Sequence, residues 1–396
     1  MTKRRGLVLR EARVVTPSGV VRNGYVAIEF GRIVDVGSEP YRGGGGLDEL
    51  YLNGMTVGPG FIDTHIHGAF GIDLSTATPD EISRLSEELV KYGVTSFVPT
   101  AVALPREELS RFCRNVLAAS KQASGARILG IHLEGPFLNP RRAGAQNPEY
   151  MRPASVAELE ELAEASGGLL KSITIAPEVD GATELIRSAV AMGVVVQVGH
   201  TDATYSKTAE AVALGATKAT HLYNAMSGIH HRVPGAALAL LRAKSTYLEL
   251  IVDFVHVAPE VVEFTVEYAG YRRVVLISDS IPATGAPEGL YKLGGLDVEV
   301  RGGIARLVGR DVLAGSTLTM SQAFLNAVSL GFRLEEAFYM ASTAPAESLG
   351  LGSDVGGVAP GRRADLVVLE RDGGVAATFV GGKLVYARES FAEQVG

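Results

Sequence analysis

The chain has 396 residues, which exceeds one ordinary domain but suits a large α/β barrel with a small additional domain. Hydrophobic residues make up 46% of it and charged residues 20%, so we expect a large buried core and exclude extensive disorder. The net charge of −7 argues against nucleic acid or an anionic membrane as the main partner. A local basic pocket could still hold an anionic small molecule.

The single cysteine, Cys113, excludes an intramolecular disulfide and a cysteine-based zinc site. We predict that its thiol packs in the core, within a helix that includes Leu109–Ala119. Charged residues interrupt the first apolar run too early for a signal-peptide core, and no apolar run of about 18 residues occurs. These observations favour a cytoplasmic protein with no membrane partner.

Alternating apolar residues predict short strands at both ends of the chain. Turn residues at Thr16–Gly19 and Gly43–Gly46 separate the first of them. The expected strands are Gly6–Val15, Gly24–Phe30, Arg32–Val36, Ala364–Leu369 and Ala377–Tyr386. We therefore predict that residues 1–58 and 362–396 form one composite β-sandwich.

Between these ends, residues 59–361 alternate strand-like and helix-like patterns, which predicts a (β/α)8 barrel. Helices are expected at Pro79–Lys91 and Val156–Ala165, among others. The Gly-rich segment 287–312 predicts a β-hairpin inserted before the last strand–helix units. The expected barrel strands are Thr95–Pro99, Ile128–Leu133, Leu170–Ala176, Val194–Val198, Ala216–Thr220, Leu248–Val252 and Val274–Ser278.

Titratable residues follow the predicted barrel strands. His65 and His67 come after an apolar run at residues 60–63, and alternate residues of a strand share one face. The others each end a predicted strand, namely Glu134, His200, His221 and Asp279. Taken singly, each residue is explained by a structural role, such as a hydrogen-bonded histidine, an ion pair or a helix cap.

Together, the six residues would lie at one rim of the barrel, where catalytic residues of this fold gather. Neutral imidazole and carboxylate groups suit Zn²⁺ or a related divalent ion. Such an ion lowers the pKa of bound water to about 7. A nearby aspartate can then take the water proton and pass it to a leaving amine. The pattern therefore predicts a metal-dependent amide hydrolase.

Longer strings around these residues closely resemble the N-acetylglucosamine-6-phosphate deacetylase family of amidohydrolases. They are PGFIDTHIHG (59–68), HLEGPF (132–137), GHTDA (199–203), THLYNAMSG (220–228), ISDSIPATG (277–285) and LAGSTLTM (313–320). The tail VAPGRRADLVVL (358–369) is common to many amidohydrolases. The resemblance covers nearly the whole chain, and it implies a distorted (β/α)8 barrel, a β-sandwich built from both ends and a homodimer.

The resemblance also implies a role for each ligand. Glu134, His200 and His221 would hold the principal metal, and Asp279 would act first as general base and then as general acid. His65 and His67 match a pair that binds a second metal in some members. We therefore expect one or two divalent ions per subunit, with zinc first and iron, manganese or cobalt as alternatives.

The same strings imply contacts with a phosphorylated amino sugar. Arg232 would reach the phosphate, including that of the neighbouring subunit's site, because its planar guanidinium suits phosphate oxygens. Asn224, Ala225 and His256 would lie near the sugar phosphate. The other implied contacts are Ala145 and Gln146 in RRAGAQNP (141–148), and Leu313, Ala314 and Gly315 beside the acetamido group.

The chain departs from the family pattern at two of these positions. Gln146 stands where the family typically has a histidine that helps to polarise the substrate carbonyl. An amide still donates a neutral hydrogen bond there, but it carries no positive charge. Val233 follows Arg232 where an acidic residue is frequent. Both departures bear on the substrate and leave the hydrolase class unchanged.

Several alternatives stay open at this stage. N-acetylglucosamine 6-phosphate is the first substrate, and its galactosamine epimer is the nearest variant. Another amidohydrolase, such as a cyclic-amide hydrolase or an N-acyl amino acid deacylase, ranks lower, because many cyclic-amide hydrolases use a carbamylated lysine where this chain has Glu134. A non-catalytic scaffold would have lost ligands that are all present here.

Overall fold

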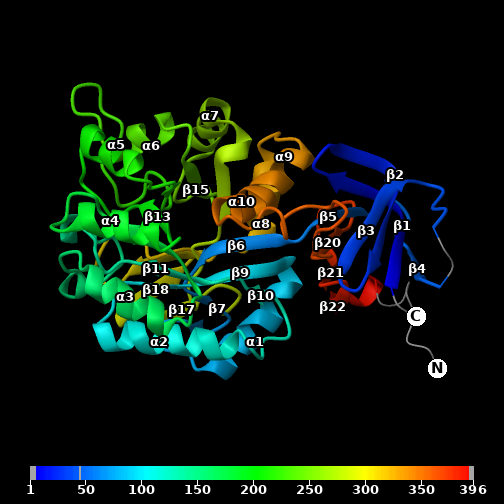
Figure 1. Cartoon of the computed structure of the whole chain (residues 1–396), viewed down its shortest axis with the longest axis horizontal. Helices are drawn as coiled ribbons and strands as arrows, with labels where there is room; N and C mark the ends of the chain where they lie inside the picture. Colours follow the sequence, from blue (N-terminus) through cyan, green and yellow to red (C-terminus); the bar gives the residue numbers. More distant parts are fainter. Residues whose placement is uncertain (1–5, 44–45, 392–396) are drawn as a thin grey trace.

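The computed structural model of the chain describes residues 6–43 and 46–391. Two residues of the predicted glycine turn, Gly44 and Gly45, and the outer ends of the predicted composite domain, 1–5 and 392–396, lie outside the described residues. Figure 1 shows two parts side by side, a large barrel and a smaller sheet that carries both ends of the chain.

The larger part is a closed barrel of parallel strands. A parallel bridge between Ile66 and Ser280 joins the last strand to the first. A short strand, β10 (Arg127–Ile128), adds a second pairing along β9. The barrel strands are β6 (Phe61–Ile66), β9 (Val94–Ala101), β11 (Ile131–Glu134), β12 (Leu170–Ile175), β13 (Val195–Val198), β14 (Lys218–Ala219), β15 (Tyr247–Ile251) and β16 (Val274–Ile277).

A helix follows each barrel strand and covers its outer face (Figure 1). This arrangement confirms the predicted (β/α)8 fold. Among the described residues, no helix is both long and apolar enough to cross a membrane. The helices are α1 (Pro79–Leu89), α2 (Arg106–Ala119), α3 (Val156–Ala165), α4 (Ala182–Ala191), α5 (Tyr205–Ala213), α6 (Ala236–Arg242), α7 (Pro259–Ala269) and α8 (Met320–Ser329).

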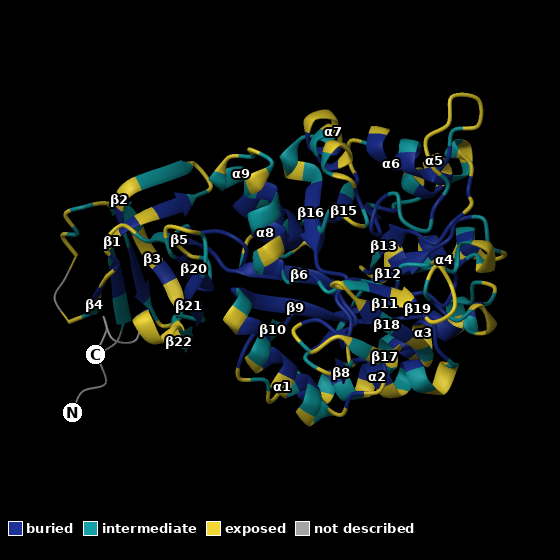
Figure 2. Cartoon of the chain, turned by 180° about the vertical axis from the view of Figure 1, so that it is seen from behind, coloured by how far each residue is buried: buried dark blue, intermediate teal, exposed yellow. Residues whose placement is uncertain are grey.

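The barrel strands are buried on both faces, as Figure 2 shows by their dark colour. Every residue of β6, β9, β11 and β16 is buried. Burial on both faces explains why β16 (Val274–Ile277) reads as a continuous apolar run rather than as an alternating one. Cys113 in α2 is buried in the same core, as predicted.

Strands from both chain ends form one eight-stranded sheet. The sheet curls, so that Arg32 at the start of β3 bridges to Arg363 just before β20, and it encloses a hydrophobic core of its own. The division of the chain at residues 58 and 362 stays a prediction. The strands are β1 (Gly6–Thr16), β2 (Gly19–Glu29), β3 (Arg32–Ser38), β4 (Asp48–Tyr51), β5 (Thr56–Pro59), β20 (Leu366–Leu369), β21 (Val375–Val380) and β22 (Lys383–Ala387).

Three segments differ from their prediction. The segment 287–312 forms three antiparallel strands, β17 (Gly289–Leu293), β18 (Leu296–Arg301) and β19 (Ile304–Leu307), and it follows the last barrel strand instead of preceding it. The predicted strand Ala377–Tyr386 is two strands, because Gly381 and Gly382 both adopt a left-handed backbone and turn the chain. The predicted strand Ile128–Leu133 is divided into β10 and β11.

Smaller elements complete the chain. The strands β7 (Gly68–Ala69) and β8 (Ile72–Asp73) form a hairpin after β6. Short 3-10 turns occur at Val90–Tyr92, Pro140–Arg142, Pro148–Tyr150 and Tyr271–Arg273. After α8, the chain returns to the terminal sheet through α9 (Leu334–Phe338), a π-helical turn (Tyr339–Thr343) and α10 (Ala344–Ser348).

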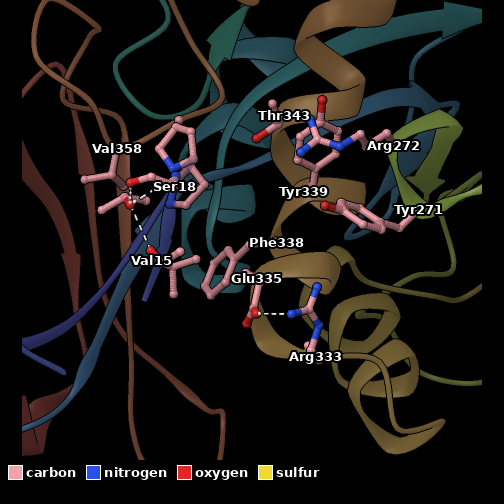
Figure 3. A pocket seen from close by; sticks show the side chains of 15 residues that line it. Val15, Ser18, Tyr271, Arg272, Arg333, Glu335, Phe338, Tyr339, Thr343 and Val358 are labelled. Carbon is pink, nitrogen blue, oxygen red and sulfur yellow. Dashed lines mark hydrogen bonds and ion pairs between the residues drawn. The ribbon is translucent and has the colours of Figure 1, made fainter. Parts of the chain in front are cut away.

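A cavity of about 240 Å³ lies where the terminal sheet meets the barrel (Figure 3). The guanidinium of Arg272 lies 5.5 Å from the ring centre of Tyr271 and 5.1 Å from that of Tyr339. Arg333, on the same wall, pairs with Glu335 at 3.1 Å. The residues lining this cavity include none of the predicted metal ligands, which gather at the carboxyl ends of the barrel strands.

Candidate active site

The predicted ligands occupy the carboxyl ends of the barrel strands. His65 lies in β6, and Glu134 ends β11. His200, His221 and Asp279 each follow their strand by two residues and have a positive φ, of 46°, 26° and 49°. Such a conformation costs free energy for a residue with a side chain, and it concentrates at functional sites. The three side chains are therefore turned toward the barrel axis by backbone that local propensity disfavours.

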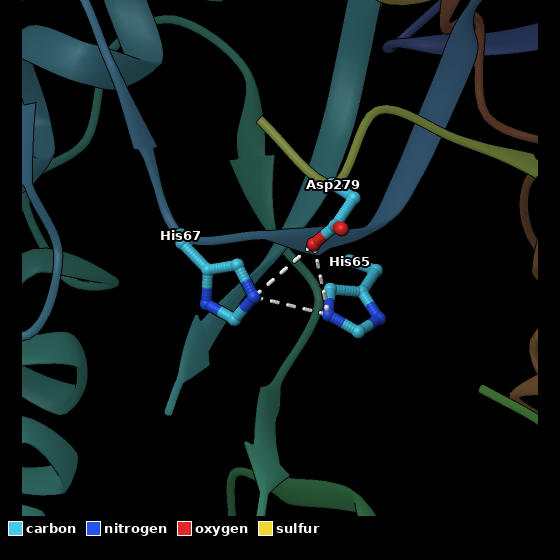
Figure 4. A group of neighbouring side chains, drawn as sticks. All are labelled: His65, His67 and Asp279. Carbon is cyan, nitrogen blue, oxygen red and sulfur yellow. Dashed lines mark hydrogen bonds and ion pairs between the residues drawn. The ribbon is translucent and has the colours of Figure 1, made fainter. Parts of the chain in front are cut away.

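Three of these side chains form the first group of convergent donors, shown in Figure 4. The Nε2 atoms of His65 and His67 lie 3.2 Å apart. Asp279 Oδ1 is 3.4 Å from the former and 3.2 Å from the latter. All three residues are buried. Two imidazoles and a carboxylate facing one point match the donor set of a divalent metal ion.

Glu134, His200 and His221 form the second group. Glu134 Oε1 is 2.9 Å from Nε2 of His200 and 2.7 Å from Nε2 of His221, and those nitrogens are 3.2 Å apart. The other oxygen, Oε2, lies 3.2 Å from Nε2 of His67 in the first group. The carboxylate of Glu134 therefore stands between the two groups.

Three of the four imidazoles have a hydrogen-bond acceptor at the ring nitrogen opposite the groups, and Nδ1 of the fourth, His221, is buried without a partner. Nδ1 of His65 faces a carboxylate oxygen of Glu249 at 3.1 Å. Nδ1 of His67 faces the carbonyl of Thr100 at 3.3 Å, and Nδ1 of His200 faces the carbonyl of Arg142 at 2.8 Å. Because each partner only accepts, the neutral form of each ring carries its proton on Nδ1 and presents the Nε2 lone pair to the groups. The site thus fits a divalent metal.

Charge in the site favours a cation. Burial alone would raise the pKa of Asp279, but the hydrogen bond with His67 and the nearby imidazoles outweigh it and hold that pKa below its usual value. Burial likewise opposes protonation of His67, yet hydrogen bonds to Asp279 and Glu134 raise its pKa to about 9. The carboxylates therefore stabilise positive charge where the two groups meet.

Both groups border a cavity of about 340 Å³, a volume within the range of small-molecule sites. Most of the predicted substrate contacts line it, namely Ala145, Gln146, Asn224, Ala225, His256, Leu313 and Gly315. Ala314 is fully buried behind this wall, and its amide donates to the carbonyl of Ala305. The lining residues that sequence analysis missed are Val102, Gly144, Leu293, Asp311 and Val312.

Arg232 does not line this cavity. It lies in an exposed loop, residues 228–233, between β14 and α6 at the barrel rim (Figure 2). Its guanidinium contacts Nε2 of His231 at 2.7 Å. Ile229 and Val233 of the same loop are 51% and 68% exposed. Among the residues that line the cavity, none is an arginine or lysine.

Gln146 contacts a predicted metal ligand. Its Oε1 accepts a 2.7 Å hydrogen bond from the backbone N–H of Ala103, which fixes the orientation of the amide. Nε2 therefore faces Glu134 and donates to Oε2 at 2.7 Å. Nε2 is also 3.4 Å from Nε2 of His200. The side chain thus supports the Glu134 group while lining the substrate cavity.

Sequence analysis also missed a layer of buried polar residues inside the barrel, below the two groups. Lys218 and Glu249 form an ion pair, with Nζ 2.7 Å from Oε1. His132 bonds to Ser172 at 2.8 Å and to Thr174 at 3.1 Å, and burial lowers its pKa to about 3. The sequence did contain a signal for this layer, because Lys218 and Glu249 are charged residues inside buried strands, β14 and β15. Lys218 belongs to neither ligand group and is bound to Glu249 instead.

Comparison with known proteins agrees with this geometry. Residues 56–385 match the model of the amidohydrolase family. The chain is 35% identical to an N-acetylglucosamine-6-phosphate deacetylase from Bacillus subtilis, over 98% of this chain and 99% of the relative. It is 36% identical to an N-acetylgalactosamine-6-phosphate deacetylase from Escherichia coli O157:H7, over 95% of this chain and 98% of the relative.

Solved structures give the same result. A mutant N-acetyl-D-glucosamine-6-phosphate deacetylase from Mycobacterium smegmatis, in complex with N-acetyl-D-glucosamine-6-phosphate, is 40% identical, with a TM-score of 0.91 over 97% of this chain and 100% of that one. The N-acetylglucosamine-6-phosphate deacetylase of Thermotoga maritima is 33% identical, with a TM-score of 0.87 over 96% and 100%. The chain therefore belongs to the amidohydrolase family, in the branch that contains these amino-sugar phosphate deacetylases.

Proposed function

We propose that the protein hydrolyses N-acetylglucosamine 6-phosphate to glucosamine 6-phosphate and acetate. The observation that carries this proposal is the position of Asp279, whose carboxylate belongs to the first ligand group and lines the cavity. An acid–base residue next to metal-activated water is what amide hydrolysis needs. Relatives along the whole chain that are named for this activity support the choice of substrate.

The residues divide the chemistry as follows. A divalent ion, when bound, acidifies water and polarises the acetyl carbonyl. Asp279 has a lowered pKa and is ionised at neutral pH, so it accepts the proton from the attacking water. The water oxygen adds to the carbonyl carbon, and Asp279 then returns the proton to the nitrogen as the C–N bond breaks. The second water proton also passes to the amine, so the products are acetate and the protonated amino sugar.

The geometry favours two ions per subunit. Each group offers three donor atoms within 4.8 Å of one another, and Glu134 faces both groups. Imidazole and carboxylate donors suit zinc first, with iron, manganese and cobalt as alternatives. Glu134, His200 and His221 would hold the principal ion, and His65, His67 and Asp279 the second.

Residues on two sides of the cavity would contact different parts of the substrate. Leu313 and Gly315 would border the acetyl methyl group, with Ala314 packed behind them. Asn224, Ala225 and His256 would lie along the sugar toward the phosphate. Nδ1 of His256 is held by Asp253 at 2.7 Å, which leaves Nε2 for the ligand. Gln146 would hold Glu134 in place, and its neutral amide would not supply a charge to the carbonyl.

The phosphate needs a cation that this cavity does not contain among its lining residues. We infer that a second copy of the chain supplies Arg232, whose exposed loop carries two exposed apolar residues, Ile229 and Val233, suited to burial in a dimer interface. The protein would thus act as a homodimer. A cytoplasmic location agrees with its lone, buried cysteine.

The test is acetate release from N-acetylglucosamine 6-phosphate, with elemental analysis of the same sample and a chelator-treated control. Release that depends on metal supports the proposal. Bound metal without acetate release would still support a metal-dependent hydrolase but would rule out this substrate.

The second candidate substrate is N-acetylgalactosamine 6-phosphate, because a deacetylase of that sugar is 36% identical over almost the whole chain. Assaying both epimers on one preparation decides between them. The epimer with the larger kcat/KM is the substrate.

A further inference from the structure

A buried ion pair lies directly below the two ligand groups. Lys218 on β14 and Glu249 on the neighbouring strand β15 are both fully buried, and their charged atoms are 2.7 Å apart. Taking two charges out of water costs several kcal/mol per ion, and apolar side chains of the same size often serve stability equally well. Stability alone therefore does not explain this pair, and its contacts indicate another role.

The contacts of Glu249 lead to the metal ligands. Its Oε1 faces Lys218, and its Oε2 lies 3.1 Å from Nδ1 of His65. The same Oε2 accepts from the backbone N–H of His221 at 3.3 Å. One carboxylate oxygen thus contacts a residue from each ligand group.

Lys218 holds this carboxylate in place. Its Nζ also donates to Oγ1 of Thr64 at 2.9 Å, and Thr64 precedes His65 on β6. The hydroxyl of Thr64 in turn lies 3.3 Å from Oε1 of Glu249. Because an ionised carboxylate only accepts hydrogen bonds, Nδ1 of His65 must be the protonated nitrogen. The Nε2 lone pair then points at His67 and Asp279.

We propose that Glu249, whose buried charge Lys218 neutralises, is a positioning residue for the metal site. Its carboxylate fixes His65 as the tautomer that binds through Nε2, and so it sets the affinity of the His65–His67–Asp279 group for its ion. Imidazole ligands generally need such a partner, and losing it costs about 10- to 100-fold in metal affinity. This inference rests on one part of the proposed function, namely that the His65–His67–Asp279 group binds a metal ion. It does not depend on which sugar is hydrolysed.

Two double variants test the proposal, and both remove the ion pair without leaving a lone charge. In Lys218→Met/Glu249→Gln, the amide oxygen can still accept from His65, and the amide nitrogen can donate to Thr64. In Lys218→Met/Glu249→Leu, no acceptor remains. The two proteins therefore differ in the acceptor that residue 249 offers to Nδ1 of His65 and to the backbone N–H of His221.

The measurement is Zn²⁺ affinity of chelator-stripped protein, in competition with a coloured chelator. We expect the Glu249→Leu double variant to bind its weakest ion about 10- to 100-fold less tightly than wild type. The Glu249→Gln double variant should stay within about threefold. Equal affinities in the two variants for every ion bound would overturn the proposal, including the case in which each protein holds a single ion equally tightly.

Ser172→Ala serves as the matched control. It removes a hydrogen bond from His132 in the same buried layer, but His132 belongs to neither ligand group. We expect its zinc affinity to equal that of wild type. A thermal unfolding curve of each variant, measured without metal, separates loss of fold from loss of affinity. Acetate release from the same samples tests the proposed function separately. If wild type binds zinc but releases no acetate, the proposed substrate is wrong, and the proposed arrangement of metal ligands still stands.

Discussion

At the residue scale, the site depends on side chains whose backbone is held in an unfavourable conformation. The positive φ of Asp279 is maintained by two hydrogen bonds, because its amide donates to the carbonyl of His65 and its carbonyl accepts from the amide of Ser316. Rigid placement matters because proton transfer needs an acid–base group within hydrogen-bond reach of the reacting atoms.

Asp279→Asn tests the acid–base role. The amide keeps the size of the side chain but cannot accept the water proton, so we expect kcat to fall about 10²- to 10⁴-fold. The Glu134 group is untouched, and its ion should remain bound. Steady-state kinetics with elemental analysis measures both. Unchanged turnover would remove Asp279 from this role.

Gly315→Ala tests how the cavity wall holds Asp279. Gly315 has a φ of +54°, and a Cβ there would lie 2.5 Å from Cγ2 of Ile281 and 2.8 Å from the carbonyl oxygen of Asp279. The clash should displace Asp279, so we expect kcat/KM to fall at least about tenfold, which corresponds to about 1.4 kcal/mol. Initial-rate kinetics measures it.

Gly302→Ala is the control for that change. Gly302 has a φ of +57°, yet nothing lies within 4 Å of its Cβ position. It should lose about 1 kcal/mol of stability through the left-handed backbone and keep full activity. Equal losses of activity in both variants would show that backbone strain, and not contact with Asp279, is responsible.

At the element scale, the terminal sheet is held by a charged pair at its surface. Arg10 on β1 binds Glu39, just past β3, through two hydrogen bonds of 3.0 and 2.8 Å. The hydrogen bond from Arg10 dominates over burial and lowers the pKa of Glu39 from 4.5 to about 2. A lowered folded-state pKa stabilises the fold above pH 4.5, and this contribution is lost as the pH falls toward 2.

Glu39→Gln should therefore destabilise the protein by about 1 kcal/mol at pH 7, a value kept small by solvent screening. The difference between the two proteins should shrink between pH 4.5 and pH 3. Urea unfolding at several pH values measures it. A difference that is constant with pH would show that the pair contributes through packing and not through charge.

At the scale of the whole molecule, the residues that line the cavity include no arginine or lysine to bind the proposed phosphate group. The exposed loop 228–233 projects from the rim, and Arg232 is not among the residues that line the cavity of its own chain. A second copy could bring Arg232 to that cavity across an interface with two-fold symmetry, in which each chain serves the other.

Mixing Arg232→Ala with Asp279→Asn, at a substrate concentration well below the KM of the former, tests this arrangement. Arg232→Ala should raise KM for the phosphorylated sugar more than for the unphosphorylated one, and Asp279→Asn should abolish turnover. In a mixed dimer, the chain that keeps Asp279 receives Arg232 from its partner. Random exchange then restores about a quarter of wild-type sites. An activity equal to the average of the two parents would mean that Arg232 does not serve the neighbouring site.

The sequence by itself determined the barrel and its ligands. The strand runs, the positions of His65, Glu134, His200 and Asp279 after them, and the motif strings could all be read locally, because each depends only on the order of neighbouring residues. The fold prediction is confirmed, and the predicted ligands lie in two groups of convergent donors, one of which also includes Asp279.

Only the tertiary structure decided which side chains meet. Pairing of β14 with β15 brings Lys218 beside Glu249, and closure of the barrel places both under His65 of β6, which lies far away in the chain. The pairing of Gln146 with Glu134, like the distance of Arg232 from its own cavity, depends on how loops fold over the rim. Local patterns record the periodicity and burial of each element, whereas contacts between elements depend on strand order and stagger, which no single segment encodes.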